Sequence, residues 1–193
     1  MPVEVKRAGS RVYERLDWLH AWHCLTGPAY GLIHPGLAQR MTAGAGILHS
    51  ERNDSWVLDG PRHERDVEMV QMWVVPDAAG VTPSYEQLDI SAELDAGGLV
   101  LVASGVPRHE DDAAIRIRNR YATLWAARLQ PGASVHLPAA PWVHLYVPRG
   151  SVDVEGVGLL STGDAARCTD EPGRRVTARE ASEVLVWEML TSL

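Results

Sequence analysis

The residues of this chain whose types and spacing are best suited to chemistry are a histidine and a glutamate two positions apart, His49 and Glu51. They follow a glycine-rich stretch within MTAGAGILHSERND, residues 41–54. If this segment is a β-strand, both side chains point from the same face, within about 4 to 6 Å of each other. A histidine and a carboxylate so placed can share one metal ion, but two protein ligands rarely hold a metal tightly. The pair therefore predicts part of a metal site.

Three further histidines are candidates for a third ligand. His34 stands just before a Pro-Gly turn, and His20 and His23 would share one helix face if residues 10–23 are helical. Their spacing does not demand coordination, so two interpretations stay open. Either one of them completes a rebuilt three-ligand site, or all three are packing and surface histidines.

The other polar groupings point to structure more than to chemistry. His136 and His144 have no carboxylate two positions away, which favours structural or exposed roles. Cys24 and Cys168 are far apart and form no Cys-x-x-Cys pair, so they predict neither a metal site nor a disulfide framework. No serine or cysteine has the neighbours of a catalytic triad, and the Ala-Gly-Ala-Gly stretch lacks the lysine of a phosphate-binding loop.

The composition is that of an ordinary globular protein. The 193 residues are 46% hydrophobic and 22% charged, with a formal net charge of -7. A negative balance with scattered basic residues argues against nucleic-acid binding. No run of about 20 apolar residues predicts a membrane span, and the charged N-terminus lacks the apolar core of a signal peptide. We therefore expect a cytoplasmic protein with no nucleic-acid or membrane partner.

Most of the chain has the pattern of short β-strands. Two near-continuous apolar runs of strand length cover residues 67–75 and 98–104. From residue 121 onward, turns containing glycine recur at short intervals and separate apolar stretches. These stretches are YATLWAARL, WVHLYV, SVDV, AARC and VLVWEM. Short strands with regular turns are typical of an all-β sandwich or barrel.

Helical signals are few. Residues 10–23 have apolar side chains at helical spacing after Ser10, which is an N-cap candidate. Residues 109–114, HEDDAA, predict a charged loop or a short helical turn. This segment is a suitable junction between two halves of the chain.

These segments resemble the pirin family, whose members are bicupins with two β-barrel cupin domains packed face to face. The stretch PGLAQRMTAGAGILHSERND (35–54) carries the most specific match, to the family segment Pro-Gly…Gln-Arg-Met-Ser-Ala-Gly-x-Gly-x-x-His-Ser-Glu. VQMWVVP (70–76) resembles the family's Gln-x-Trp strand, and PSYEQ (83–87) resembles the motif that follows it. LDWLHAWHC (16–24) resembles the N-terminal Trp-Leu…His element, and the second half resembles the C-terminal cupin more weakly.

One element of the family pattern is missing from this sequence. Between the N-terminal element and the 35–54 segment the family has several more strands, which carry a His-x-His motif within His-Pro-His-Arg. The 193 residues contain no His-x-His. In the family those two histidines hold the metal together with the pair that corresponds to His49 and Glu51. The resemblance therefore implies that this chain retains half of the metal site.

The resemblance implies an all-β bicupin fold, with an abbreviated N-terminal cupin over residues 1–105 and a more complete C-terminal cupin over residues 106–193. Family members with quercetin 2,3-dioxygenase activity place a flavonol on the metal. By that resemblance His49 is a metal ligand, and Glu51 is a ligand or the catalytic proton acceptor. The cofactor would be iron or another divalent transition metal, weakly held or absent, because a non-haem iron site needs at least three fixed protein donors.

Three functions follow from the resemblance and stay open. The first is a catalytically impaired protein of the metal-dependent dioxygenase lineage that binds a small aromatic, flavonol-like ligand or a protein. The second is a working quercetin 2,3-dioxygenase-type enzyme with a rebuilt site, and the third is a self-associating structural remnant. A shortened barrel would expose sheet edges and part of its apolar interior, so that some of the N-terminal tryptophans would face water; these are Trp18, Trp22, Trp56 and Trp73. We therefore expect the N-terminal half to be stabilised by another copy of the chain, by a protein partner or by the C-terminal cupin, through an apolar interface of at least about 1,000 Å².

Overall fold

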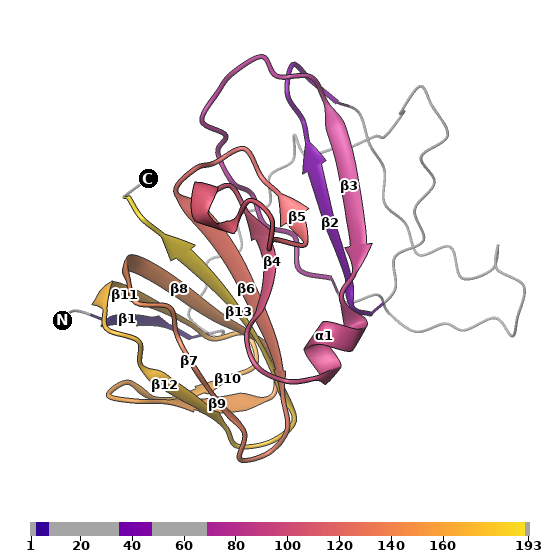
Figure 1. Ribbon diagram of the computed structural model, residues 1–193. Coiled ribbons are helices and arrows are strands. Elements are labelled where there is room, and N and C mark those ends of the chain that lie inside the picture. Colours follow the sequence, from indigo (N-terminus) through magenta and orange to yellow (C-terminus); the bar gives the residue numbers. More distant parts are fainter. Residues whose placement is uncertain (1–2, 8–34, 48–68, 192–193) are drawn as a thin grey trace, which may run out of the picture.

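The computed structural model describes residues 3–7, 35–47 and 69–191 of the chain (Figure 1). Its strands are β1 (Val3–Lys6), β2 (Leu37–Thr42), β3 (Ser84–Asp89), β4 (Val100–Ser104), β5 (Ile115–Arg116), β6 (Ala122–Leu129), β7 (Ser134–His136), β8 (Ala140–Arg149), β9 (Ser151–Val154), β10 (Gly158–Ser161), β11 (Ala165–Glu171), β12 (Arg175–Ala178) and β13 (Ser182–Met189). Helical structure in these residues is limited to α1 (Ser91–Asp95) and the 3-10 helix η2 (Pro107–His109). The described part of the chain is therefore all-β, as the sequence predicts.

Two sheets face each other and form what we call the C-terminal sandwich. The larger sheet has the strand order β1-β11-β8-β13-β6-β4-β5, and the smaller one has the order β10-β9-β12-β7. Figure 1 shows the smaller sheet lying across one face of the larger. This arrangement confirms the sandwich or barrel that the short strands and regular turns predict.

Alternation along the strands explains where the core of the C-terminal sandwich lies. In β13 every second side chain is buried, and Val184 and Val186 are both 0% exposed. Successive side chains of a strand point to opposite faces, so one face of β13 supplies this core. Val152 and Val176 of the smaller sheet and Leu145 of β8 belong to the same apolar cluster. Removing such side chains from water is the main force that holds the two sheets together.

Strands β2 and β3 form a separate two-stranded sheet, which stands beside the edge of the larger sheet (Figure 1). The two strands pair antiparallel, from Leu37 opposite Asp89 to Thr42 opposite Ser84. A second apolar cluster lies at the junction and contains Ile90, Leu94, Val102, Ala103, Ile115, Leu124 and Ala126. Ala38 of β2 packs against this cluster. The two-stranded sheet is thus supported by side chains on the outer face of the larger sheet.

The larger sheet contains strands from both predicted halves of the chain. Strands β1 and β4 precede residue 105, and they pair with β11 and β6, which follow it. The division into residues 1–105 and 106–193 stays a prediction. In the described residues, the halves share one hydrogen-bonded sheet.

The strands predicted over residues 98–104 and after residue 121 are confirmed. The apolar run 98–104 contains β4, and the five stretches after residue 121 coincide wholly or in part with β6, β8, β9, β11 and β13. The charged segment 109–114 follows η2 as a turn, which confirms a loop or short helical turn. The helix predicted over residues 10–23 lies outside the described residues.

The strand predicted over residues 67–75 is wrong for residues 69–75, which form an irregular segment; residues 67 and 68 lie outside the described part. Its contacts come from side chains in place of a strand ladder. The Asn119 amide donates to the Val75 carbonyl at 2.9 Å, and Trp187 Nε1 donates to Met72 Sδ at 3.2 Å. A strand needs a neighbouring backbone to pair with, and an apolar run does not reveal whether one is available.

The segment 69–75 presents an unusual amount of apolar surface. The side chains of Met69, Val70, Met72, Trp73 and Val75 are between 37% and 74% exposed.

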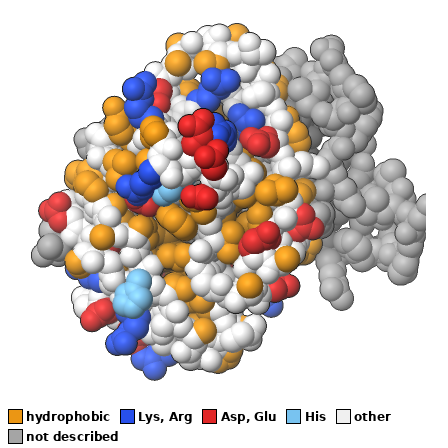
Figure 2. All heavy atoms as spheres, in the orientation of Figure 1, with side chains coloured by type: hydrophobic (Ala, Val, Ile, Leu, Met, Phe, Trp, Pro, Cys, Tyr) orange, Lys and Arg blue, Asp and Glu red, His pale blue; other side chains and the backbone are white. Residues whose placement is uncertain are grey.

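On the face drawn in Figure 2, basic and acidic side chains lie beside one another and form no continuous basic surface. The helices in the described residues are too short to cross a membrane.

A tight turn follows β2 and leads toward His49. The Ala45 N–H donates to the Val81 carbonyl at 3.0 Å. Gly44 has a φ of +54°, and a Cβ at this position would lie 2.0 Å from the same carbonyl oxygen. Only glycine fits both this conformation and this space. The glycine-rich stretch that precedes His49 in the sequence thus forms a tight turn at Gly44.

We predict that Leu145→Ala lowers the free energy of unfolding by about 2–5 kcal/mol, because it empties a fully buried position of the core. Leu159→Ala is the matched control, since that side chain is 49% exposed, and its effect should stay within about 0.5 kcal/mol. Urea denaturation followed by circular dichroism measures both. Equal effects of the two substitutions would contradict the assigned core.

We also predict that Gly44→Ala destabilises the protein by more than Gly80→Ala. Both glycines have a positive φ, +54° and +68°, so each substitution carries a backbone cost of about 1 kcal/mol. Only at Gly44 would the new methyl group collide with a carbonyl oxygen, because nothing lies within 4 Å of the corresponding position at Gly80. Thermal unfolding of the two variants measures the difference. A milder effect at Gly44 would show that the turn is built differently.

Candidate functional site

The two residues of the predicted metal site, His49 and Glu51, lie outside the described residues, as do His20, His23 and His34. Their shared strand face, their separation and the identity of a third ligand stay predictions. What the structure places is the two-stranded sheet of β2 and β3 and the glycine turn that follows β2. The candidate site is therefore built here from the elements that approach it.

Arg40, on β2, is a largely enclosed cation on the strand that leads to the predicted pair. Its side chain is 17% exposed. Nη1 donates to Thr42 Oγ1 at 2.8 Å and to Ser84 Oγ at 3.2 Å, and Nη2 lies 3.2 Å from Glu86 Oε2. The Nε–H is buried and has no hydrogen-bond partner in the structure. An orphan donor of this kind costs about 1–3 kcal/mol, so the surrounding contacts must hold the guanidinium firmly.

The histidines within the described residues do not converge on a metal. His109, His136 and His144 are the ones described, and residues 3–7, 35–47 and 69–191 hold no group of three or more His, Cys, Asp or Glu that fits a metal ion. The Nδ1–H of His136 donates to the Gly173 carbonyl at 3.1 Å, and this side chain is exposed. His144 is half-buried opposite Arg167. The structural and exposed roles expected for His136 and His144 agree with these positions.

Sequence reasoning missed a polar row inside the C-terminal sandwich. Ser104, Thr123 and Glu188 stand opposite one another on the adjacent strands β4, β6 and β13. All three are at most 4% exposed, and Ser104 Oγ lies 2.9 Å from Thr123 Oγ1. The 3-10 helix η2 places Arg108 and His109 against this row. The available signal was a polar residue at an inward position of two otherwise apolar strands.

The geometry of this row does not make Ser104 a nucleophile. The Nε–H of Arg108 lies 3.1 Å from His109 Nε2, and a guanidinium can only donate. His109 Nε2 is therefore the acceptor, and the imidazole proton sits on Nδ1, which faces Ser104 Oγ at 3.1 Å. A general base would need its lone pair on that nitrogen. The ring donates toward the hydroxyl groups and cannot activate them.

Cys168 is also excluded as a nucleophile. The side chain is 2% exposed, on β11. Burial raises the pKa of the thiol to about 11, and a hydrogen bond with Glu171 acts in the same direction. The thiolate is the reactive form of cysteine, and at neutral pH it is nearly absent here. Cys168 therefore acts as a core side chain.

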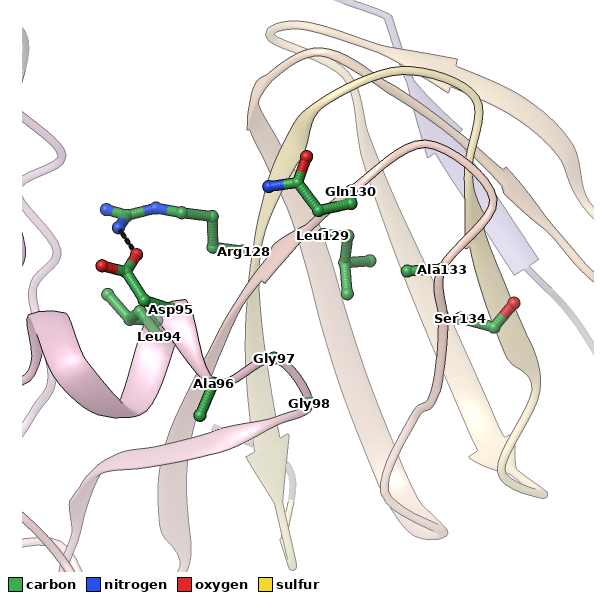
Figure 3. A pocket seen from close by; sticks show the side chains of 10 residues that line it. All are labelled: Leu94, Asp95, Ala96, Gly97, Gly98, Arg128, Leu129, Gln130, Ala133 and Ser134. Atoms are coloured by element: carbon green, nitrogen blue, oxygen red, sulfur yellow. Dashed lines mark hydrogen bonds and ion pairs between the residues drawn. The ribbon is translucent and has the colours of Figure 1, made fainter.

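A shallow pocket of about 310 Å³ lies between the turn after α1 and the turn that joins β6 to β7 (Figure 3). Figure 3 shows Asp95 and Arg128 facing each other at one end of it. The Arg128 guanidinium is already bound by the carboxylates of Asp95 and Glu183. The charged groups that line this pocket, Arg128 and Asp95, are thus already paired.

Two family profiles match the chain, one in each half. The Pirin profile matches residues 26–74. The profile of the quercetinase C-terminal cupin domain matches residues 101–189. The first match includes the predicted metal pair, and the second covers most of the C-terminal sandwich.

Curated relatives agree with these matches. A Mycobacterium tuberculosis protein, provisionally named a quercetin 2,3-dioxygenase, is 53% identical over 163 residues, which are 84% of this chain and 63% of that protein. The Escherichia coli quercetin 2,3-dioxygenase is 33% identical over 158 residues, which are 81% of this chain and 62% of that enzyme. The chain thus spans a little less than two thirds of the length of these relatives.

Solved structures share the fold. The Escherichia coli pirin YhhW, solved in complex with nickel(II), superimposes with a TM-score of 0.52 and 27% identity, over 62% of this chain and 49% of that one. Quercetin 2,3-dioxygenase from Acinetobacter baumannii superimposes with a TM-score of 0.57 over 81% of this chain and 57% of that one, at 24% identity. Together with the two profile matches, these likenesses show that the chain belongs to the pirin family of all-β bicupin proteins, in the cupin dioxygenase lineage.

Proposed function

We propose that this chain is a pirin-family protein that has lost most of its catalytic competence and acts by binding a small aromatic, flavonol-like molecule. The observation that carries the proposal is the ligand count. His49 and Glu51 are present, whereas no His-x-His occurs in the 193 residues. A metal that activates oxygen needs at least three fixed protein donors and open positions for substrate.

The proposed roles of the remaining pair follow from their chemistry. His49 offers a neutral imidazole nitrogen, and Glu51 offers a carboxylate that binds a metal or accepts a proton. A bound divalent transition metal would supply Lewis acidity for a chelating ligand. The name of the E. coli relative and the nickel in its pirin support metal binding and a flavonol-like ligand as the chemistry of this site. Among the described residues, no group of three or more His, Cys, Asp or Glu side chains forms a separate metal site.

The alternative is a working quercetin 2,3-dioxygenase-type enzyme with a rebuilt metal site. Its third ligand would be His23 or His34, which lie on elements adjoining the matched segment in the sequence. The quercetin dioxygenase names of the relatives favour this alternative, and the missing His-x-His favours the impaired protein. Metal content separates the two.

We predict that the purified protein contains well under one equivalent of transition metal and consumes quercetin slowly or not at all. Each absent histidine removes one nitrogen donor and one fixed angle, so the remaining pair competes with water for the ion. Mass spectrometry for iron, nickel, copper, manganese and zinc gives the stoichiometry. Quercetin consumption is then measured with each metal added back.

His49→Ala and His136→Ala form the control pair for this experiment. His136 is exposed and bonded to a backbone carbonyl, so its loss should leave metal content and activity unchanged. Stoichiometric metal with turnover that is lost in His49→Ala and kept in His136→Ala would contradict the proposal of a catalytically impaired protein. It would establish the working dioxygenase. Metal-free protein that still binds flavonols would support a cupin pocket without its chemistry.

We further propose that the chain associates with itself through the exposed apolar segment 69–75. Trp73 and Val75 are 74% and 70% exposed, which is unusual for large apolar side chains so close together. A specific interface buries at least about 1,000 Å² in total. Two copies of such a segment provide the apolar centre that an interface of this kind needs.

The double substitution Trp73→Ser with Val75→Ser should shift the protein toward the monomer, because it removes that apolar centre. Trp142→Ser is the control, since Trp142 is a half-exposed tryptophan of β8 outside the segment. Size-exclusion chromatography with light scattering gives the mass of each variant. A wild-type protein that is monomeric at all accessible concentrations would rule out self-association.

A further inference from the structure

The C-terminal sandwich contains a buried carboxylate that the proposed function does not use. Glu188 is 1% exposed and lies on β13, opposite Thr123 of β6 and Val143 of β8. Its neighbours along β13 on the same face are the apolar Val186 and Val184. A charge in such a place is stable only where donors compensate its lost hydration.

Two donors provide this compensation, and they come from very different places. Trp125 Nε1 donates to Glu188 Oε2 at 2.9 Å from within the sandwich. Arg108 forms an ion pair through Nη2 with Oε1 of the same carboxylate. The Arg108 side chain is 54% exposed, whereas that of Glu188 is 2% exposed. The cation therefore enters from solvent, on a three-residue 3-10 helix, whereas the carboxylate stands on a strand of the sandwich.

The groups around the Arg108 guanidinium are mainly acceptors. Besides the carboxylate, His109 Nε2 accepts from Arg108 Nε at 3.1 Å. The imidazole is edge-on to the Trp125 ring, with centroids 5.6 Å apart and an interplanar angle of 82°. The protonated Nδ1 is turned to the hydroxyl groups of Ser104 and Thr123 at 3.1 and 3.2 Å. A carboxylate and an imidazole acceptor are suited to a planar guanidinium-type cation with several N–H groups.

We propose that the end of the C-terminal sandwich is a recognition site for a guanidinium group, and that Arg108 is its built-in occupant. Glu188 and His109 Nε2 are the acceptors of the site, and Trp125 positions the carboxylate. A ligand with such a group competes with Arg108 and displaces its side chain into solvent. This site is independent of His49 and Glu51, so the proposed function and this inference stand or fall separately.

The test uses the full chain with Arg108→Ala and the probes guanidinium and methylguanidinium chloride at low millimolar concentration. Arg108→Ala leaves a buried carboxylate without its cation and should lower the melting temperature by about 6–20 °C. Either probe should restore it along a saturable curve. Tetramethylammonium chloride at the same ionic strength should not, because this cation has no N–H donor.

Two matched variants decide the origin of any rescue. Arg108→Ala combined with Glu188→Gln should bind methylguanidinium at least about tenfold more weakly than Arg108→Ala alone, measured by calorimetry. Arg120→Ala removes another exposed arginine, paired with Asp77, and should show no saturable rescue. The wild-type protein should bind the probe more weakly than Arg108→Ala, because Arg108 competes.

If Arg108→Ala does not fold alone, recovery of its folded circular dichroism signal with methylguanidinium, and not with tetramethylammonium, gives the same positive result. A loss of stability without saturable rescue would make Arg108 and Glu188 a structural ion pair only and would overturn the proposal. Equal rescue by tetramethylammonium would also overturn it. Equal binding by the single and double variants would show that Glu188 is not the recognition group.

Discussion

The burial of the inward row of β13 is the constraint on which the described structure depends. This strand lies between β8 and β6 in the larger sheet, and its Val184 and Val186 close the core against the smaller sheet. Strand parity then dictates the other face, where Leu185 and Trp187 pack toward the second cluster. One strand therefore contributes both to the core of the C-terminal sandwich and to the second apolar cluster, against which the two-stranded sheet of β2 and β3 packs.

This dependence gives the two halves of the chain unequal roles. The C-terminal sandwich has a closed core with many fully buried side chains. The two-stranded sheet of β2 and β3 contributes only Ala38 to the second cluster. The contacts of Arg40 with Thr42, Ser84 and Glu86 connect its two strands. This pair of strands precedes the predicted metal pair, His49 and Glu51, in the sequence, and it belongs to the less buried part of the described fold.

The polar row of the C-terminal sandwich contrasts with the rest of its core. A buried carboxylate with an exposed arginine partner is a poor way to gain stability, because desolvation cancels much of the attraction. The register of three strands nevertheless gathers Ser104, Thr123 and Glu188 at one level. A recognition role accounts for this cost, since a site that must bind N–H donors needs preformed acceptors. The proposed recognition site lies in the second half of the sequence, whereas the predicted metal pair lies in the first.

The sequence by itself determined the all-β class, most strands after residue 98 and the glycine turn at Gly44, because side-chain alternation and turn residues are local properties. From their spacing it also predicted that His49 and Glu51 share a metal ion, and this stays a prediction because both residues lie outside the described part of the chain. Tertiary structure alone decided that residues 69–75 form no strand, since strand formation depends on an available pairing partner. It alone assembled Glu188 with Arg108, which is 80 positions away in the chain. Register between strands and the docking of η2 bring such residues together, and neither is encoded in any local pattern.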